Sequence, residues 1–160
     1  MALRFSTGLK NALLGESGID TGANGLRGVF KDGVINVYSG AQPASADDAV
    51  TGTLLGTVTV DGAAFTPGSP TGGLEFGAPA SGVVAKSVAE TWKFTGLAAG
   101  TAGWFRFVGN ALDGGASSTS LPRIDGSIAR TGGDLNLSNT TIAVGAPTTI
   151  DVFQLTMGNG

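Results

Sequence analysis

The residues best suited to catalysis in this 160-residue chain are four consecutive ones, Asp20-Thr21-Gly22-Ala23. The same signature occurs in retroviral-type aspartic proteases, in which two aspartates, one from each subunit, share a proton and supply both acid and base. That chemistry needs a rigid apolar strand leading into the aspartate. Residues 15–19 instead read Gly-Glu-Ser-Gly-Ile, which is the composition of a loop, so the context argues against a protease.

Other catalytic and metal-binding patterns are missing from the sequence. The chain has no histidine and no cysteine, which excludes imidazole bases, thiol nucleophiles and Cys/His zinc sites. No glycine is followed by lysine and then serine or threonine, as a phosphate-binding loop requires. Asp47-Asp48 lacks the alternating oxygen ligands of an EF-hand, which favours a solvated loop over a calcium site. We therefore expect a protein that is not an enzyme and that has no metal or cofactor.

Charge and hydropathy restrict the partners and the location. The net charge is −3 and only 13% of residues are charged, whereas nucleic-acid binders usually carry a basic face. No apolar run approaches the roughly 18 residues of a membrane helix, and residues 1–5 lack the apolar stretch of a signal peptide. We expect no nucleic-acid partner, no membrane, and synthesis in the cytoplasm. The 28 glycines favour close backbone packing or flat surfaces that contact neighbours.

Two regions differ in their local pattern. Residues 1–31 are expected to form an N-terminal arm with a short helix over 8–14, capped by Ser6 or Thr7, and a helical turn over 26–31. Residues 32–160 contain eight or nine short strands separated by turns, without a long helix. This spacing is typical of an antiparallel sandwich or barrel, and we predict an all-β, jelly-roll-like sandwich.

The alternation of apolar residues along the strands predicts the core. The residues expected inside are Val37, Leu54, Val58, Trp92, Phe94, Phe107, Ile128, Ile142, Phe153 and Leu155. In the strand Val88 to Thr95, Val88 is expected on the same face as Trp92 and Phe94. Gly96 to Gly103 is expected to be a small-residue connection into the strand Trp104 to Val108.

Several side chains are candidates for a protein interface. Trp104 and Arg106 alternate with two phenylalanines, so both faces of that strand carry bulk, and one face is expected to be covered or to bind a partner. A helix of seven residues is too short to be stable alone, so the arm is expected to dock on another surface. A solvated basic surface and an exposed carbohydrate-stacking platform are the alternatives. The interface candidates are Arg4, Leu9, Lys10, Leu13, Arg27, Phe30, Trp104 and Arg106.

Four segments of the chain stand out together: Gly33–Asp47, Thr53–Thr59, Gly103–Phe107 and Asp134–Ser138. In this order they resemble the sequences of a family of small virion-associated proteins of tailed bacteriophages. The resemblance spans residues 8 to 157 and includes no catalytic motif.

Within that setting, the chain is most similar to head decoration, or cement, proteins. The resemblance implies a sandwich on the capsid surface, made in the host cytoplasm, that stabilises the shell by bridging subunits of the major capsid protein. It also implies a homo-oligomer, with a trimer as the expected form. A neck or tail position is the alternative, as is a receptor- or carbohydrate-binding module that exposes Trp104 or the loop Asp113–Ser120.

Overall fold

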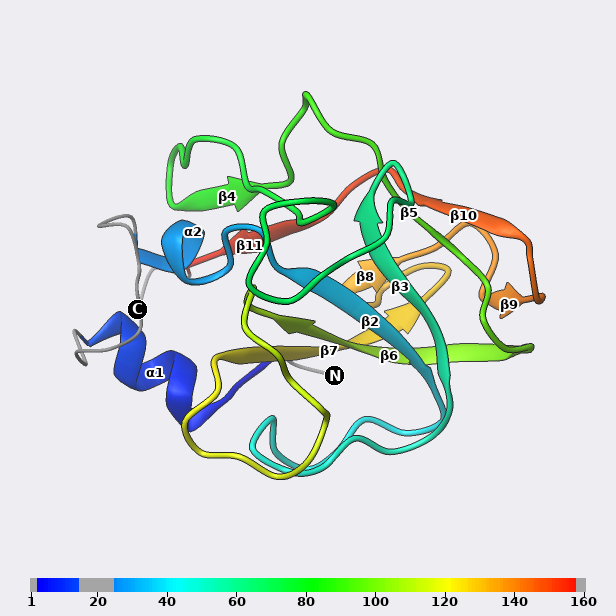
Figure 1. Ribbon diagram of the computed structural model, residues 1–160, viewed down its shortest axis with the longest axis horizontal. Coiled ribbons are helices and arrows are strands. Elements are labelled where there is room, and N and C mark those ends of the chain that lie inside the picture. The colour runs from blue at the N-terminus through cyan, green and yellow to red at the C-terminus, as the bar shows by residue number, and fades with distance from the viewer. Residues whose placement is uncertain (1–2, 15–24, 158–160) are drawn as a thin grey trace.

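The computed structural model describes residues 3–14 and 25–157 of the chain. Short strands dominate these residues, and both helices are small (Figure 1). In chain order the elements are β1 (Arg4–Phe5), α1 (Thr7–Leu13), α2 (Gly25–Val29), β2 (Val34–Ser39), β3 (Leu54–Val60), β4 (Val83–Ala85), β5 (Trp92–Thr95), β6 (Gly100–Val108), β7 (Arg123–Ala129), β8 (Leu135–Asn136), β9 (Thr141–Ile142), β10 (Pro147–Ile150) and β11 (Gln154–Thr156).

The main sheet has the strand order β1-β7-β6-β2-β3-β5-β10, and each pairing along this path is antiparallel. β8 adds to β7 in parallel, and β9 pairs with the start of β6. β4 and β11 form a second, two-stranded sheet. The predicted all-β antiparallel sandwich is confirmed, while its jelly-roll form stays a prediction.

Two predicted strand boundaries are wrong. β5 begins only at Trp92, and Val88 lies outside it with its side chain fully exposed. β6 begins at Gly100, inside the segment expected to be a connection. Small residues are required there because a Cβ on Gly103 would overlap the carbonyl oxygen of Gly40. The small side chains that resembled a loop therefore permit close packing within a strand.

Aromatic rings fill the space between the main sheet and the β4–β11 pair. Phe107 on β6 lies at the centre of this cluster, with ring centroids 4.8 Å from Phe30, 5.5 Å from Phe76 and 6.0 Å from Phe153. Trp92 on β5 lies edge-on to Phe107 at 6.2 Å. Such tilted and edge-to-face contacts are the arrangement that aromatic rings prefer.

Nine of the ten predicted core residues are buried, and Leu54 is the exception. Its neighbour Leu55 is fully buried instead. The pairing of β2 with β3 shifts register between Val37 and Tyr38, so that Val37 lies opposite Gly56 and Tyr38 opposite Leu54. This β-bulge leaves Leu55 as the extra residue and breaks the simple alternation on which the prediction relied.

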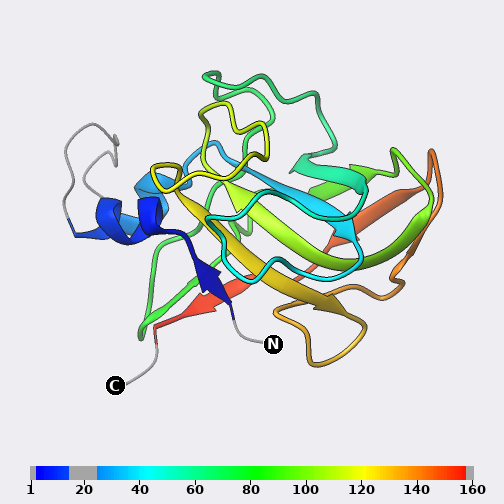
Figure 2. The same cartoon turned by 90° about the horizontal axis from the view of Figure 1, so that it is seen from below.

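The described part of the N-terminal segment packs against the sandwich. β1 pairs with β7, and α1 follows at one end of the sheet (Figure 2). The Ser6 hydroxyl caps α1 by accepting the Leu9 N–H at 3.0 Å, and it donates to the carbonyl of Leu121 at 2.8 Å. Leu9 and Phe30 are fully buried and belong to the main hydrophobic cluster. Leu9 and Phe30 therefore share the core of the strands that follow.

Candidate functional site

The outer face of strands β6 and β7 carries charged side chains that are buried. Arg106 donates from Nε to Oδ1 of Asp125 and from Nη2 to Oδ2, both at 2.7 Å, and the two side chains are 1% and 0% exposed. The residues lie directly opposite each other in the β6–β7 register. The third donor group, Nη1, reaches the carbonyl of Asp48 at 3.1 Å. The ion pair thus anchors the loop that connects β2 to β3.

A second buried ion pair holds another loop on the same face. Arg123 donates to both oxygens of Asp113, from Nε at 2.6 Å and from Nη2 at 2.7 Å. It also donates to the carbonyls of Ala116 at 2.8 Å and Ala46 at 3.3 Å. One guanidinium therefore binds both the β2–β3 loop and the β6–β7 loop. Five fixed donors on a planar group suit arginine to this task, which lysine would perform poorly.

Trp104 lies on the same face, beneath the two loops that the arginines hold. Its ring stacks on Tyr38 with centroids 4.6 Å apart, and the Arg106 guanidinium lies 5.5 Å from its centroid. The indole N–H is buried and has no hydrogen-bond partner among the described residues, as is also true of the side-chain amide of Gln42. The face that was expected to be a partner interface is thus covered by the chain's own loops.

Burial shifts the pKa of two groups in this layer, Asp125 and Tyr38. It raises the pKa of Asp125, and the hydrogen bonds and charge of Arg106 oppose that shift. Burial likewise raises the pKa of the Tyr38 hydroxyl. Every Asp125 oxygen is already paired with a guanidinium N–H, so the geometry suits a structural anchor and leaves no surface for a substrate.

The structure corrects half of the predicted interface set. Leu9, Phe30, Trp104 and Arg106 are each no more than 1% exposed and are packed inside their own chain. The expectation that the N-terminal arm needs a partner to bury Leu9 and Phe30 is therefore wrong. The error arose because a local pattern does not reveal that the later strands supply the docking surface.

The other four candidates remain at least partly accessible. Arg4 donates to the carbonyl of Pro43, and Arg27 donates to that of Phe76 at 3.3 Å, so both also tie segments together. Lys10 is exposed on α1, and Leu13 is 37% exposed at its end. The aspartate motif Asp20–Ala23 lies outside the described residues.

Exposed apolar side chains identify surfaces that sequence reasoning missed. Leu97 and Val144 are 61% and 68% exposed, in the β5–β6 and β9–β10 turns. A hydrogen bond of 2.8 Å from the Gly145 N–H to the Gly96 carbonyl brings these two turns together. Leu14, at the end of α1, is 87% exposed. Figure 1 shows α1 at one end of the longest axis and β9 at the other.

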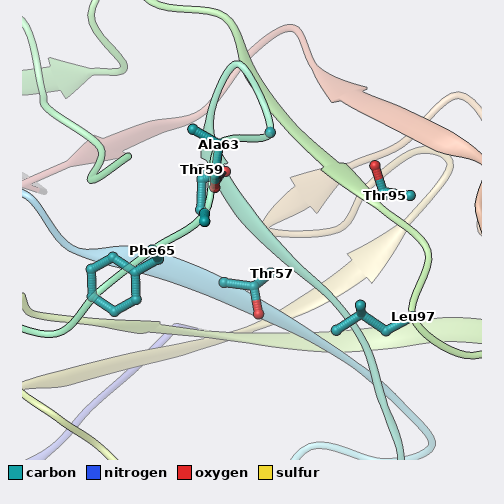
Figure 3. A pocket seen from close by; sticks show the side chains of 8 residues that line it. Thr57, Thr59, Ala63, Phe65, Thr95 and Leu97 are labelled. Atoms are coloured by element: carbon teal, nitrogen blue, oxygen red, sulfur yellow. Dashed lines mark hydrogen bonds between the residues drawn. The ribbon is translucent and has the colours of Figure 1, made fainter. Parts of the chain in front are cut away.

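An open groove of about 320 Å³ runs beside Leu97 (Figure 3). Thr57, Thr59 and Thr95 lie along it, and Phe65 lies at one side. The Thr57 hydroxyl donates to Asn36 and that of Thr59 donates to the carbonyl of Ala63, both at 2.8 Å. The groove therefore has few polar groups left with which to orient a ligand.

The alternative of a carbohydrate platform at Trp104 or the Asp113–Ser120 loop is not formed, because Trp104 is buried and Asp113 anchors its loop to Arg123. Within residues 3–14 and 25–157, no group of three acidic side chains is placed to hold a metal ion. Neither of the two helices described is long and apolar enough to cross a membrane. No protein-family model, curated protein or solved structure matches the chain.

Proposed function

We propose that the protein is a non-enzymatic structural component of a tailed-bacteriophage virion, which decorates the capsid and stabilises it by bridging major capsid subunits. One observation carries this proposal beyond the sequence resemblance. Large apolar side chains are exposed near both ends of the long axis: Leu14 follows α1 at one end, and Leu97 and Val144 lie in the β5–β6 and β9–β10 turns at the other. A molecule with an apolar contact at each end is suited to joining two neighbours.

A contact made by one or two exposed apolar side chains is weak by itself. Exposed apolar patches mark interaction sites in otherwise soluble proteins, and a standard interface buries about 800 Å² on each partner. Many identical copies around a symmetric shell add their contacts through avidity, provided that each copy touches more than one subunit. The bridging role therefore requires both ends, and this is the property to test. A trimer around local threefold positions is the arrangement that we propose.

The buried ion pairs support a mechanical role. Arg106 and Arg123 fix the two long loops to the sheet through carbonyl contacts, which makes the body between the two apolar ends rigid. A rigid spacer transmits shear from one capsid subunit to the next, whereas a flexible one would stretch before bearing load. The DNA packed inside a phage head supplies that outward load.

A position in the neck or tail, with binding to a receptor or carbohydrate, is the second candidate. The observation that favours it is the open groove in Figure 3, which has Phe65 at one side. A glycan array with the isolated protein distinguishes the candidates, because a specific micromolar hit abolished by Phe65→Ala supports the binding module. Absence of any hit supports the structural role.

The bridging proposal is tested by binding of purified protein to particles produced without it. We expect Leu14→Ser and the double variant Leu97→Ser/Val144→Ser each to weaken binding strongly, because each removes one of two contacts. Val88→Ser is the matched control, since Val88 is fully exposed elsewhere on the surface. Binding by both end variants equal to that of the wild type would overturn the proposal. Deleting residues 1–14 is a poor test because Leu9 belongs to the core.

A further inference from the structure

A second groove, of about 640 Å³, lies where the main sheet meets the small β4–β11 sheet. Figure 2 shows β1 and β11 on the same side of the molecule. The groove is lined from the main sheet by Leu3, which precedes β1, and by Asp134 and Asn136 at β8. From the other side it is lined by Asp151 and by both ends of β11, Gln154 and Thr156.

β11 presents an unused strand edge to this groove. The Lys86 N–H donates to the Phe153 carbonyl and the Met157 N–H donates to the Gly82 carbonyl, both at 2.9 Å. In an antiparallel ladder, this pattern places the backbone groups of Gln154 and Thr156 on the side away from β4. These groups make no hydrogen bond to any residue that the structure describes.

β1 is also an edge strand, because it ends the strand order of the main sheet. The Ser6 N–H donates to the Arg123 carbonyl at 3.1 Å, which makes Arg4 and Asp125 the hydrogen-bonded pair. The backbone groups of Leu3 and Phe5 therefore point away from β7. Two strand edges with outward-facing donors and acceptors thus border one region of the molecule.

By contrast, the opposite end of the main sheet is protected against pairing with another chain. β10 ends the strand order there and begins with Pro147, whose nitrogen has no hydrogen to donate. Proline on an edge strand is a common device against pairing with another chain. β11 and β1 contain no proline. The chain therefore blocks pairing at β10 and leaves the edges of β11 and β1 able to pair.

The acidic side chains that line the groove favour a basic occupant. Asp134 and Asp151 both line it, and no lysine or arginine among the described residues does. The carboxylate of Asp134 already accepts the Ser127 N–H and O–H at 2.8 Å, whereas Asp151 is exposed and has no partner among the described residues. Val152, beside it, is 70% exposed. An incoming strand with a basic residue would pair with Asp151 and cover this apolar neighbour.

We propose that the β11 edge binds an extended, basic segment of a partner protein by β-strand addition. Main-chain hydrogen bonds to Gln154 and Thr156 would supply affinity, and Asp151 would supply preference for lysine or arginine. This goes beyond the capsid role proposed above and does not depend on it, because the edge and its charge belong to the chain itself.

The test uses three blocked peptides added to the ¹⁵N-labelled full chain. Lys-Val-Thr-Val-Lys is the probe, Glu-Val-Thr-Val-Glu is its charge-reversed twin, and Lys-Val-Pro-Val-Lys removes a strand donor. We expect the first peptide alone to shift the Gln154 and Thr156 amide resonances and slow their hydrogen exchange. Equal binding of the acidic twin, or no protection of these amides at millimolar peptide, would overturn the proposal.

Variants separate strand addition from general charge attraction. Thr156→Pro removes an outward N–H and leaves the hydrogen bonds to β4 in place. Because the peptide then loses one hydrogen bond, we expect it to bind roughly three- to tenfold more weakly. Thr156→Val, which keeps the N–H, is the matched control and should bind as the wild type does. Asp151→Asn should weaken binding of the basic peptide, and Asp61→Asn, outside the groove, should not.

Two measurements establish that the variants are folded and that the edge is free. Thermal unfolding of each variant is recorded before its peptide binding is compared with that of the wild type. Sedimentation of the unliganded chain tests whether a second copy already occupies the edge. A dimer in which the Gln154 and Thr156 amides are protected without peptide would overturn the proposal in favour of self-pairing, whereas a chain with unprotected amides supports it.

Discussion

The two faces of the sheet formed by β2, β6 and β7 are both buried, but by different means. The inner face is covered by aromatic rings from β5 and from the segments around Phe76 and Phe153. The outer face is covered by two loops, which are held by guanidinium contacts to backbone carbonyls. Apolar packing is non-directional, whereas each arginine N–H needs an acceptor at one place. The inner face therefore supplies stability, and the outer face fixes loop positions.

The energetics of the two faces differ accordingly. Burying apolar area contributes about 25 cal/mol per Å², and close packing adds to it. A buried ion pair first loses the hydration of both charges, and its net contribution is often near zero compared with apolar residues of similar volume. Removing only one charge is costly because the other stays buried and unpaired. The comparison therefore predicts that a single substitution on either face lowers the free energy of unfolding. Only on the outer face should a second substitution, which removes the remaining charge, restore it.

The largest effect is expected from Phe107→Ala on the inner face. The Phe107 ring contacts four others, so the substitution leaves a cavity bounded by rigid rings. We expect a loss of about 4 kcal/mol in the free energy of unfolding, measured by chemical denaturation. A loss below about 1 kcal/mol would show that the ring cluster is not the main source of stability.

Arg106→Met is expected to follow, with a loss of about 3 kcal/mol, because it leaves Asp125 buried without a partner. The double variant Arg106→Met/Asp125→Leu should recover most of that loss. Its β2–β3 loop amides should nevertheless exchange faster than in the wild type, since the anchor at the Asp48 carbonyl is gone. A double variant as unstable as the single one would remove the distinction between the two faces.

Gly56→Ala is a smaller change on the inner face. A Cβ at position 56 would overlap the ring of Phe94, which fills the space above this glycine. We expect a destabilisation of about 2 kcal/mol from overpacking. Gly132→Ala is not an equivalent control because its φ is positive, so Gly114→Ala, which meets open space, serves as the reference. Equal stability of the two alanine variants would contradict the close packing described.

The smallest effect concerns the carboxylate of Asp47, which connects the β2–β3 loop to Thr7 at the start of α1. Burial alone raises the pKa of Asp47, but the Thr7 hydroxyl and N–H, at 2.6 Å and 2.7 Å, outweigh it, and the pKa is lowered below the usual 3.8. A lowered pKa stabilises the folded state above the usual value, and this stabilisation is lost as the pH falls through the folded-state value.

The difference in melting temperature between wild type and Asp47→Asn should therefore shrink from about pH 6 to about pH 3. Asp61→Asn, whose carboxyl has no such partners among the described residues, is the control. A wild-type advantage that stays constant over this range would show that the Thr7 contacts do not depend on the charge of Asp47.

Local pattern was sufficient to predict the fold class and most of the core. Alternation placed Trp92, Phe94 and Phe107 inside, and Ser6 was one of the two caps that the sequence offered for the first helix. Leu54 was misplaced because a β-bulge is a property of two paired strands, and one strand's pattern does not reveal it.

The outer face was the least predictable part. Bulk on both faces of the Trp104–Val108 strand indicated that the second face is covered or binds a partner, and the partner interface expected at Trp104 and Arg106 was wrong. Arg106 meets Asp125 only because β6 pairs with β7 in one particular register, and Arg123 meets Asp113 across a long loop. The available signal was an arginine within a strongly apolar strand, since Arg106 lies between Phe105 and Phe107. For exposed turn residues such as Leu97 and Val144, the sequence contained no signal of exposure.

The central claim is that this protein reinforces a phage capsid by bridging its subunits, and heat resistance of the particle tests it most directly. Particles made without the protein, the same particles with wild-type protein added back, and particles with the Leu97→Ser/Val144→Ser variant added would be heated while released DNA is measured. The account predicts that depleted particles release DNA at a lower temperature, and that only the wild-type protein restores resistance. Identical release temperatures for depleted and complete particles would contradict it.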